Sequence, residues 1–334
     1  MAYDGKVMSR ALQRFEQDRQ QRREEVEQRR EGLFQRQPRL RAIENELRAT
    51  TSRIIAVALR KGADPRKAVE TLRDDNLRLQ QEKHTLLRQL NLPEDCLDDK
   101  PLCPLCGDTG YRDGRVCQCL KRYYAQEQQK ELSRMLDLGS QSFDSFDLDY
   151  YPDQLAPGQP KSARRHMEER VYETCVDYAH HFGRKMENLL LFGAPGLGKT
   201  HLSAAIAREV SSQGFSVVYD TAGHVFERFE TQKFSREEGA DTDVDRILKC
   251  DLLILDDLGT EYASSYMLSC FYTILNTRLG CKKPTIYTTN IVDGTLFEKR
   301  YTEKIASRLG GSCEAVEFRG EDIRHLKKLE QDAY

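Results

Sequence analysis

Residues 193–200 read GAPGLGKT, and this stretch decides the fold of the 334-residue chain. It fits the spacing G-x-x-x-x-G-K-[ST], whose glycines let successive backbone N–H groups turn toward a chain of phosphates. The apolar run at 188–192 before it predicts a buried strand, and residues 201–210 after it predict a helix. A chance match in a glycine-rich turn is the weaker interpretation, because a helix N-terminus in this place favours an anion.

Two side chains of this stretch carry the chemistry of a nucleoside triphosphate site. The ammonium group of Lys199 is placed to reach the β- and γ-phosphates, and the Thr200 hydroxyl is placed to hold Mg²⁺. The sequence therefore predicts ATP and Mg²⁺ as ligands. The residues expected to line the nucleotide here are Gly193, Ala194, Pro195, Gly196, Leu197, Gly198, Lys199, Thr200 and His201.

A second apolar run, at 252–255, is followed directly by two acids. A continuous apolar run of this length is typical of a buried parallel strand, and ligands bind beyond the C-terminal ends of such strands. Asp256 is expected to hold the water shell of Mg²⁺, and Asp257 is expected to polarise the attacking water. Two solvated acids at a strand end are the alternative, which is weak beside the stretch at 193–200.

Helices and strands alternate from residue 163 onward, which predicts a parallel sheet with helices on both faces. A helix is expected at 163–182. Strands are expected near 189–192, 216–219, 252–255, 284–289 and 313–317. The linker before them holds four aromatic residues that would pack on the domain or on an adenine base: Phe143, Phe146, Tyr150 and Tyr151.

The region before residue 95 is expected to be helical. Residues 6–37 are rich in Arg, Glu and Gln, and apolar residues then recur at spacings of three and four on either side of a break at 61–65. This pattern predicts a helical hairpin or coiled coil in which Asn76 and Lys83 interrupt the apolar seam and fix its register or partner. A docking surface for another protein and a self-contained structural hairpin are both open interpretations.

Four of the ten cysteines lie within seventeen residues: Cys103, Cys106, Cys117 and Cys119. Their C-x₂-C and C-x-C spacings are suited to four thiolates around Zn²⁺. The segment is too short to bury a core, so the metal would supply its folding free energy. A redox-active pair is the alternative for a C-x-x-C motif. Cys96 and His84 lie close enough in sequence to replace one ligand.

The charge is unevenly distributed along the chain. Residues 1–90 contain 21 Lys and Arg against 14 Asp and Glu, whereas the remainder contains 31 against 40. A basic helical arm suits a nucleic acid or an acidic protein surface, although a solvated helix face explains the same pattern. The sequence has no apolar run of eighteen residues and no signal-peptide pattern, so we expect no membrane span and a cytoplasmic location.

Four segments together resemble the DnaC/DnaI-type helicase loaders, which are AAA+ ATPases: residues 193–200, 253–261, 288–290 and 307–309. The cysteine-rich segment and the aromatic linker resemble the versions found in Gram-positive bacteria and their phages. The resemblance covers roughly residues 100–330. It implies an AAA+ P-loop ATPase with a parallel five-stranded sheet flanked by helices. We divide the chain into a helical hairpin, a zinc-binding segment, a linker and an AAA+ domain at 1–95, 96–125, 126–162 and 163–334.

The resemblance also implies roles for three polar residues. Asn290 takes the position of a polar sensor of the γ-phosphate or the attacking water. Arg308 takes the position of an arginine finger, which stabilises charge on ATP bound by a neighbouring subunit. Arg324 takes the position of a second sensor that touches phosphate in its own subunit. A turn-forming asparagine and an exposed surface arginine are the alternatives for the first two.

The function implied is that of an ATP-dependent loader, which places a hexameric replicative helicase of the DnaB type on single-stranded DNA during replication initiation. Slow hydrolysis would act as a switch, with Asp257, Asn290 and Arg308 as catalytic residues, and the chain would form an ATP-dependent homo-oligomer. A transposition helper ATPase of the IstB type shares the core motifs and is an alternative. A zinc and coiled-coil adaptor that binds ATP with little turnover is a further alternative. The candidate hydrolytic residues Asp256, Asp257, Asn290 and Arg308 argue against it, because an adaptor does not need them.

Overall fold

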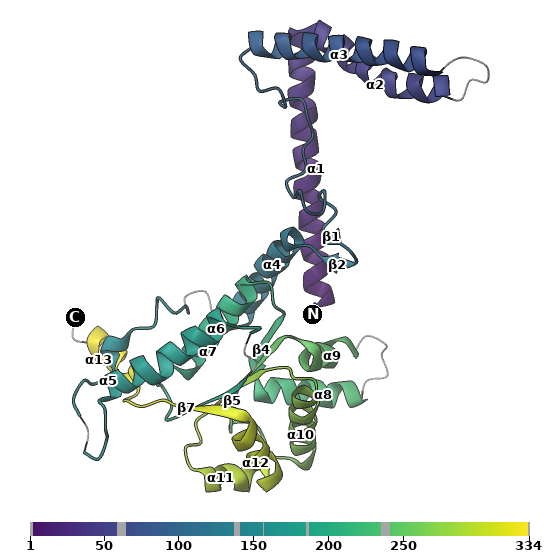
Figure 1. Cartoon of the computed structure of the whole chain (residues 1–334). Helices are drawn as coiled ribbons and strands as arrows, with labels where there is room; N and C mark the ends of the chain where they lie inside the picture. Colours follow the sequence, from purple (N-terminus) through teal and green to yellow (C-terminus); the bar gives the residue numbers. More distant parts are fainter. Residues whose placement is uncertain are drawn as a thin grey trace. The chain divides into compact units, whose positions relative to one another are not determined.

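The computed structural model describes residues 3–58, 65–136, 141–155, 157–184, 187–234 and 241–332. The chain folds into two compact units (Figure 1). The first unit combines residues 1–13 with 116–334, and the second unit comprises residues 14–115. Among the described helices, none is long and apolar enough to cross a membrane.

The first unit is built on a five-stranded parallel sheet with the order β4-β5-β6-β3-β7. Its strands are β3 (Asn188–Phe192), β4 (Val217–Thr221), β5 (Leu252–Leu258), β6 (Thr285–Thr289) and β7 (Cys313–Glu317). All five strands predicted from the sequence are confirmed. The run of four apolar residues in β5 is fully buried, because helices cover both faces of the sheet.

Alternate residues of β5 enter two separate apolar cores. Leu252 and Ile254 join the core on one face, whereas Leu253 and Leu255 join the core on the other. Figure 1 shows α6 and α7 on one side of the sheet and α8 and α10 on the other. The helices of this unit after residue 117 are α4 (Gln118–Leu136), α5 (Ala163–His166), the π-helical η3 (Met167–Tyr172), α6 (Glu173–His180), α7 (Lys199–Ser212), α8 (Ala222–Phe234), α9 (Asp241–Lys249), α10 (Ser265–Gly280), α11 (Gly294–Tyr301), α12 (Glu303–Ser312) and α13 (Ile323–Asp332).

The second unit is helical, as predicted. The chain forms α1 (Gly5–Arg36), α2 (Pro38–Ala58) and α3 (Pro65–Gln89), followed by the short strands β1 (Tyr111–Arg112) and β2 (Arg115–Val116). Helices α2 and α3 pack against each other, and the predicted break lies, apart from Pro65, outside the described residues. Where the start of α2 meets the end of α3, Leu40 and Leu87 are buried in one cluster with Leu97.

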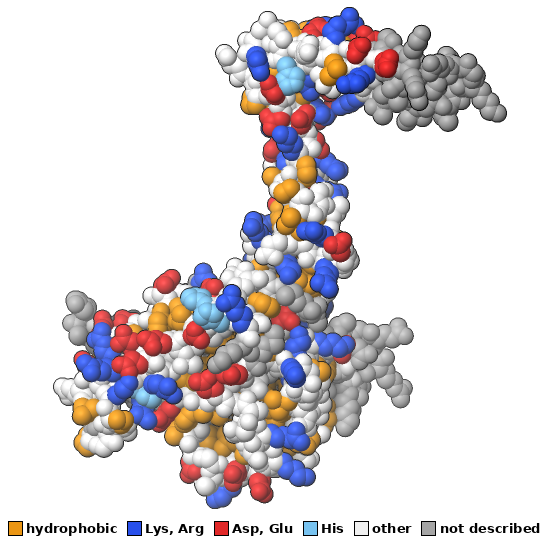
Figure 2. Space-filling view, in the orientation of Figure 1, with side chains coloured by type: hydrophobic (Ala, Val, Ile, Leu, Met, Phe, Trp, Pro, Cys, Tyr) orange, Lys and Arg blue, Asp and Glu red, His pale blue; other side chains and the backbone are white. Residues whose placement is uncertain are grey.

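The polar interruption at Lys83 has a partner in the packed pair. The Lys83 Nζ lies 2.7 Å from a carboxylate oxygen of Glu44, and both side chains are largely buried. Arg39 and Glu82 form a second ion pair between α2 and α3, with Nε 2.7 Å from Oε1. Figure 2 shows basic and acidic side chains interspersed on the face of this unit in view. Basic charge in this region is therefore partly neutralised by neighbouring acids.

The first residues of α1 pack with the sheet-containing unit. Val7 and Ala11 are fully buried in a small cluster with Tyr124 of α4. A carboxylate oxygen of Asp4 lies 2.6 Å from Nε of Arg246 in α9. Residues 3–13 therefore belong with the sheet by contact, whereas the sequence analysis grouped them with the hairpin. The predicted division into four domains stays a prediction.

Candidate functional site

A cavity of about 490 Å³ lies at the C-terminal edge of the sheet. The loop at 195–201 forms one wall, and the ends of β4, β5 and β6 form the floor. The aromatic linker and the first turn of α13 complete the lining. Parallel strands place ligand sites at this edge of a sheet.

The loop at 193–200 has the backbone that its glycines allow. Gly196 adopts φ +77°, and a Cβ atom placed there would lie 1.8 Å from the Asp322 carboxylate at the start of α13. The Gly196 carbonyl accepts a hydrogen bond of 3.1 Å from the Ile323 N–H. Helix α7 then begins at Lys199, with Gly198 as its N-cap. The loop thus ends at a helix N-terminus, as the sequence predicted.

Lys199 is buried at the centre of the loop. Its Nζ donates to the carbonyl oxygens of Gly193 at 2.8 Å and Ala194 at 2.7 Å. Burial lowers the pKa of its ammonium group to about 8. The nearby carboxylates of Asp256 and Asp257 oppose this fall in pKa, as phosphate groups in the cavity would.

Thr200 and Asp256 come together from α7 and β5. The Thr200 hydroxyl donates to Oδ2 of Asp256 at 3.1 Å. Tyr219 of β4 donates to the same oxygen at 2.9 Å, and Thr288 of β6 donates to Oδ1. A threonine hydroxyl beside a carboxylate at a phosphate-binding loop is a donor set that suits Mg²⁺.

Asp257 and Asn290 form a second polar pair at the same edge. The Asn290 Nδ2 donates to Oδ1 of Asp257 at 3.0 Å. Asp257 adopts φ +60°, which is uncommon for a residue with a side chain. Both residues line the cavity, so the structure brings together the two side chains that the sequence singled out for the attacking water.

The two arginines lie in different places. Arg324 lines the cavity from the first turn of α13, and its N–H donates to Asp322 Oδ1 at 2.9 Å. Arg308 is exposed on α12, outside the cavity lining, with its guanidinium 5.2 Å from the ring centroid of Tyr272 and in contact with Asn276. Arg324 therefore lines the cavity of its own chain, whereas Arg308 does not.

The aromatic linker lies against the loop. Phe146 stacks on Tyr172 with ring centroids 5.9 Å apart, and it forms a T-shaped pair with His201 whose ring centroids are 5.3 Å apart. The Tyr151 hydroxyl donates to the Leu197 carbonyl at 2.9 Å. Phe146 and Tyr150 also line the cavity.

Sequence reasoning missed several residues that build the cavity edge or hold the acids there. Tyr219 and Thr288 hold the Asp256 carboxylate, and Lys327 of α13 lines the cavity. Thr288 lies within the motif that drew attention to Asn290, so its position in that motif was the available signal. Tyr219 gave no such signal, because its role depends on the pairing of β4 with β5.

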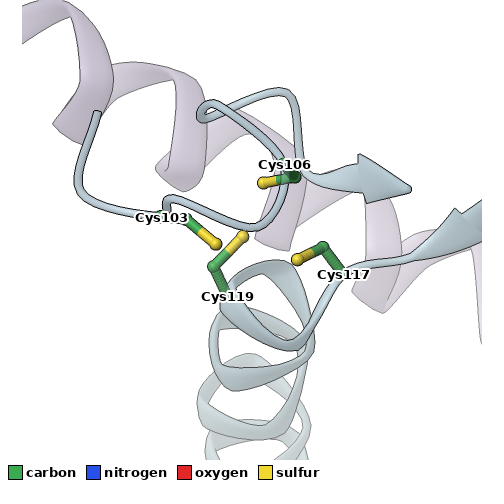
Figure 3. A group of neighbouring side chains, drawn as sticks. All are labelled: Cys103, Cys106, Cys117 and Cys119. Carbon is green, nitrogen blue, oxygen red and sulfur yellow. The ribbon is translucent and has the colours of Figure 1, made fainter. Parts of the chain in front are cut away.

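The four clustered cysteines converge, as Figure 3 shows. The sulfur atoms of Cys103, Cys106, Cys117 and Cys119 all lie within 4.8 Å of one another. Tetrahedral zinc with Zn–S distances of about 2.3 Å places its sulfur ligands roughly 3.8 Å apart, so the set fits this ion. The two residues considered as a replacement for one zinc ligand, His84 and Cys96, lie outside this cluster.

His84 lies 3.0 Å from a carboxylate oxygen of Glu94, and Cys96 packs beside the Leu40 cluster. Neither residue is part of the group of four sulfurs. The turn that carries Cys103 is held by Asp108, which accepts from the N–H groups of Leu102 at 3.0 Å and Cys103 at 2.8 Å.

Known proteins resemble the nucleotide region. Residues 166–331 match the family model described as IstB-like ATP binding protein. The replicative helicase loader DnaC of Escherichia coli strain K12 is 27% identical over 113 residues, which are 34% of this chain and 46% of that protein. A putative insertion sequence ATP-binding protein of Sinorhizobium fredii strain NBRC 101917 / NGR234 is 32% identical over 94 residues, 28% of this chain and 31% of that protein.

The crystal structure of a DnaC helicase loader matches 55% of this chain and 99% of its own chain, with a TM-score of 0.46 and 20% identity. This chain spans half or less of the length of the curated relatives described above. The family match, the parallel sheet and the loop at 193–200 agree on the nucleotide region. Residues 166–331 therefore form a P-loop nucleotide-binding region on a parallel sheet, and this region is similar to the IstB-like ATP-binding proteins.

Proposed function

We propose that this protein is an ATPase that loads a hexameric replicative helicase of the DnaB type onto single-stranded DNA. The observation that carries the proposal is the convergence of Lys199, the Thr200–Asp256 pair and the Asp257–Asn290 pair on one cavity of an IstB/DnaC-like region. Similarity to replicative helicase loaders supports the loader role. Such a protein would act in the cytoplasm.

The chain's own residues define the chemistry at the cavity. Lys199 and the loop N–H groups would bind the ATP phosphates, with Thr200 and Asp256 holding Mg²⁺, which would neutralise phosphate charge. Asp257, oriented by the Asn290 amide, would hold the attacking water and receive its proton. Arg324 would contact phosphate from α13. The arrangement supports hydrolysis rather than nucleotide binding alone, because binding needs no residue in the place of Asp257.

The position of Arg308 supports a shared site. It lies on the exposed surface of α12, away from its own cavity, so it would reach a γ-phosphate only in another copy of the chain. We therefore include ATP-dependent homo-oligomerisation in the proposal. The γ-phosphate would then order the interface between copies, and its loss would release it.

The cysteine cluster is proposed to hold one Zn²⁺. Four thiolates are the donor set of a structural zinc site, and the segment around them leaves Leu102 and Leu105 largely exposed. Such a segment lacks the buried apolar surface to fold unaided, so the ion would stabilise its turns. The helical pair α2 and α3 is proposed as the helicase-docking element.

A transposition helper ATPase is the second candidate. The relatives encoded by insertion sequences support it, one of them at 32% identity. Residues 14–115 favour the loader, since a helical and cysteine-rich region placed before the ATPase region would serve partner capture. An ATP-binding adaptor with little turnover is distinguished from both by the absence of stimulated hydrolysis.

The test is capture of the host's purified replicative helicase with ATP, ADP or no nucleotide. A matched variant replaces residues 48–78 with a short Gly-Ser loop, which keeps the Lys83–Glu44 pair and the Leu40–Leu87 contact. The loader proposal expects nucleotide-sensitive capture that this variant loses. Absent capture, together with DNA-stimulated ATP hydrolysis, would favour the transposition helper. Nucleotide binding with neither capture nor stimulated hydrolysis would favour the adaptor.

A further inference from the structure

Strand β5 carries a β-bulge at the two acids. Its pairing with β6 joins Leu255 to Tyr287, and then Leu258 to Thr289. Asp256 and Asp257 therefore both lie opposite a single residue, Thr288. A bulge leaves one residue outside the regular hydrogen-bond ladder and redirects its side chain, which agrees with φ +60° at Asp257.

The Thr288 side chain closes this bulge. Its buried hydroxyl oxygen accepts a hydrogen bond of 2.8 Å from the Asp257 N–H, which the bulge removes from the ladder. The same hydroxyl donates its proton to Oδ1 of Asp256. One hydroxyl thus holds the backbone of one acid and the carboxylate of the other, and both its donor and acceptor capacities are used.

The neighbouring strand completes the orientation of Asp256. Strand β4 pairs with β5 so that Tyr219 lies opposite Ile254, two residues before the acid. The Tyr219 hydroxyl donates to Oδ2 of Asp256 and lies 3.0 Å from the Ser203 hydroxyl. Hydroxyl donors from two flanking strands therefore hold the two carboxylate oxygens, Thr288 at Oδ1 and Tyr219 at Oδ2. A carboxylate fixed in this way has little freedom to turn away from the cavity.

We propose that Thr288 is the positioning residue of this site, and that it couples the orientation of the Mg²⁺-holding Asp256 to that of the water-polarising Asp257. The inference rests on the proposed ATPase function. In this role Thr288 acts through the two acids rather than directly on the nucleotide. Without its hydroxyl, the Asp257 N–H loses its partner and Oδ1 of Asp256 loses its donor, so both acids would sample other orientations.

The test compares Thr288→Val, which keeps the shape of the side chain, with Thr288→Ser, which keeps the hydroxyl. The matched control is Thr285→Val on the same strand, because the Thr285 hydroxyl is also buried and accepts from Arg278 at 2.8 Å, away from the cavity. ATP turnover, its KM and the Mg²⁺ concentration for half-maximal turnover are measured for each full-length variant. Thermal unfolding checks that the two valine variants remain folded.

We expect Thr288→Val to lower kcat at least tenfold with a KM for ATP within about threefold of wild type. The Mg²⁺ concentration for half-maximal turnover should rise severalfold. Thr288→Ser should recover most of the turnover, and Thr285→Val should retain it. A Thr288→Val enzyme with the kcat and Mg²⁺ dependence of Thr285→Val would overturn the proposal.

A second measurement separates this inference from the ATPase proposal. The Mg²⁺ dependence of binding is measured with a fluorescent ATP analogue, which needs no turnover. A wild-type chain without hydrolysis would refute the ATPase function alone. In that case a raised Mg²⁺ requirement for binding in Thr288→Val, absent from Thr285→Val, would support the positioning role, and equal requirements would refute it.

Discussion

Replacing Arg278 with Met should destabilise the sheet-containing unit more than any exposed arginine replacement. This side chain is almost fully buried at the end of α10. Its Nη2 donates to the Pro284 carbonyl at 2.7 Å, and its Nη1 contacts the carbonyls of Ile247 and Cys250 at 2.9 and 3.1 Å. The guanidinium therefore satisfies the C-terminal carbonyls of α9, where the helix dipole favours a cation.

The magnitude follows from what methionine would leave behind. A buried acceptor without a partner costs about 1–3 kcal/mol. Arg278→Met takes the donor from the carbonyls of Leu248 and Cys250, whereas the Pro284 carbonyl keeps the Leu253 N–H and the Ile247 carbonyl keeps the Cys250 thiol. The desolvation penalty of the guanidinium disappears at the same time, so we expect a net loss of about 3–5 kcal/mol. For a domain of this size, that loss corresponds to a fall in Tm of about 10 °C.

Calorimetry of the full chain provides the assay. Arg208→Met is the control, since Arg208 is exposed on α7 and should change Tm little. Arg278→Lys should fall between the two, because an ammonium group keeps the charge but not the planar fork of donors. A Tm for Arg278→Met within about 2 °C of the control would show that water replaces the lost donors, and would refute the reasoning.

Three further outcomes are expected. Arg308→Ala and Lys199→Ala chains should each be inactive, yet an equal mixture should recover turnover at about a quarter of the interfaces if the arginine acts between copies; no recovery at any ratio would exclude that geometry. Cys117→Ser should lower bound zinc from one ion per chain to none while Cys281→Ser, at an exposed cysteine outside the cluster, retains it; equal zinc contents would contradict the site. Because burial holds the Lys199 pKa near 8 and phosphate requires the charged amine, ATP affinity should fall as pH rises through 8, with proton uptake on binding above that pH. Binding heats at pH 8.5 that do not depend on the buffer's ionisation enthalpy would contradict this.

Much of the fold was predictable because its signals are local. The strand predicted at 252–255 follows from a continuous apolar run, and the observed strand continues to Leu258. The loop at 193–200 follows from glycine spacing within eight residues. The cysteine cluster likewise forms within seventeen residues, so its spacing was informative. In each case the residues that interact are close in sequence, and backbone geometry leaves few other arrangements.

The precise arrangement of the site could not be predicted in this way. The acids at 256 and 257 were expected at the strand end, but the bulge that turns them depends on the register between β5 and β6. That register brings Thr288 to them although it lies 31 and 32 positions further along the chain.

Two other features were decided only by tertiary packing. In the sequence, Lys83 is a polar interruption of an apolar seam. The structure shows that Glu44 of the neighbouring helix forms an ion pair with it. The sequence pattern groups residues 3–13 with the hairpin, whereas the ion pair between Asp4 and Arg246 attaches them to the sheet-containing unit. The sequence by itself thus determined the P-loop, the strands and the cysteine turns, because short-range geometry and burial period specify them. The tertiary structure alone decided which distant polar groups share a partner, because strand register and helix packing set those distances.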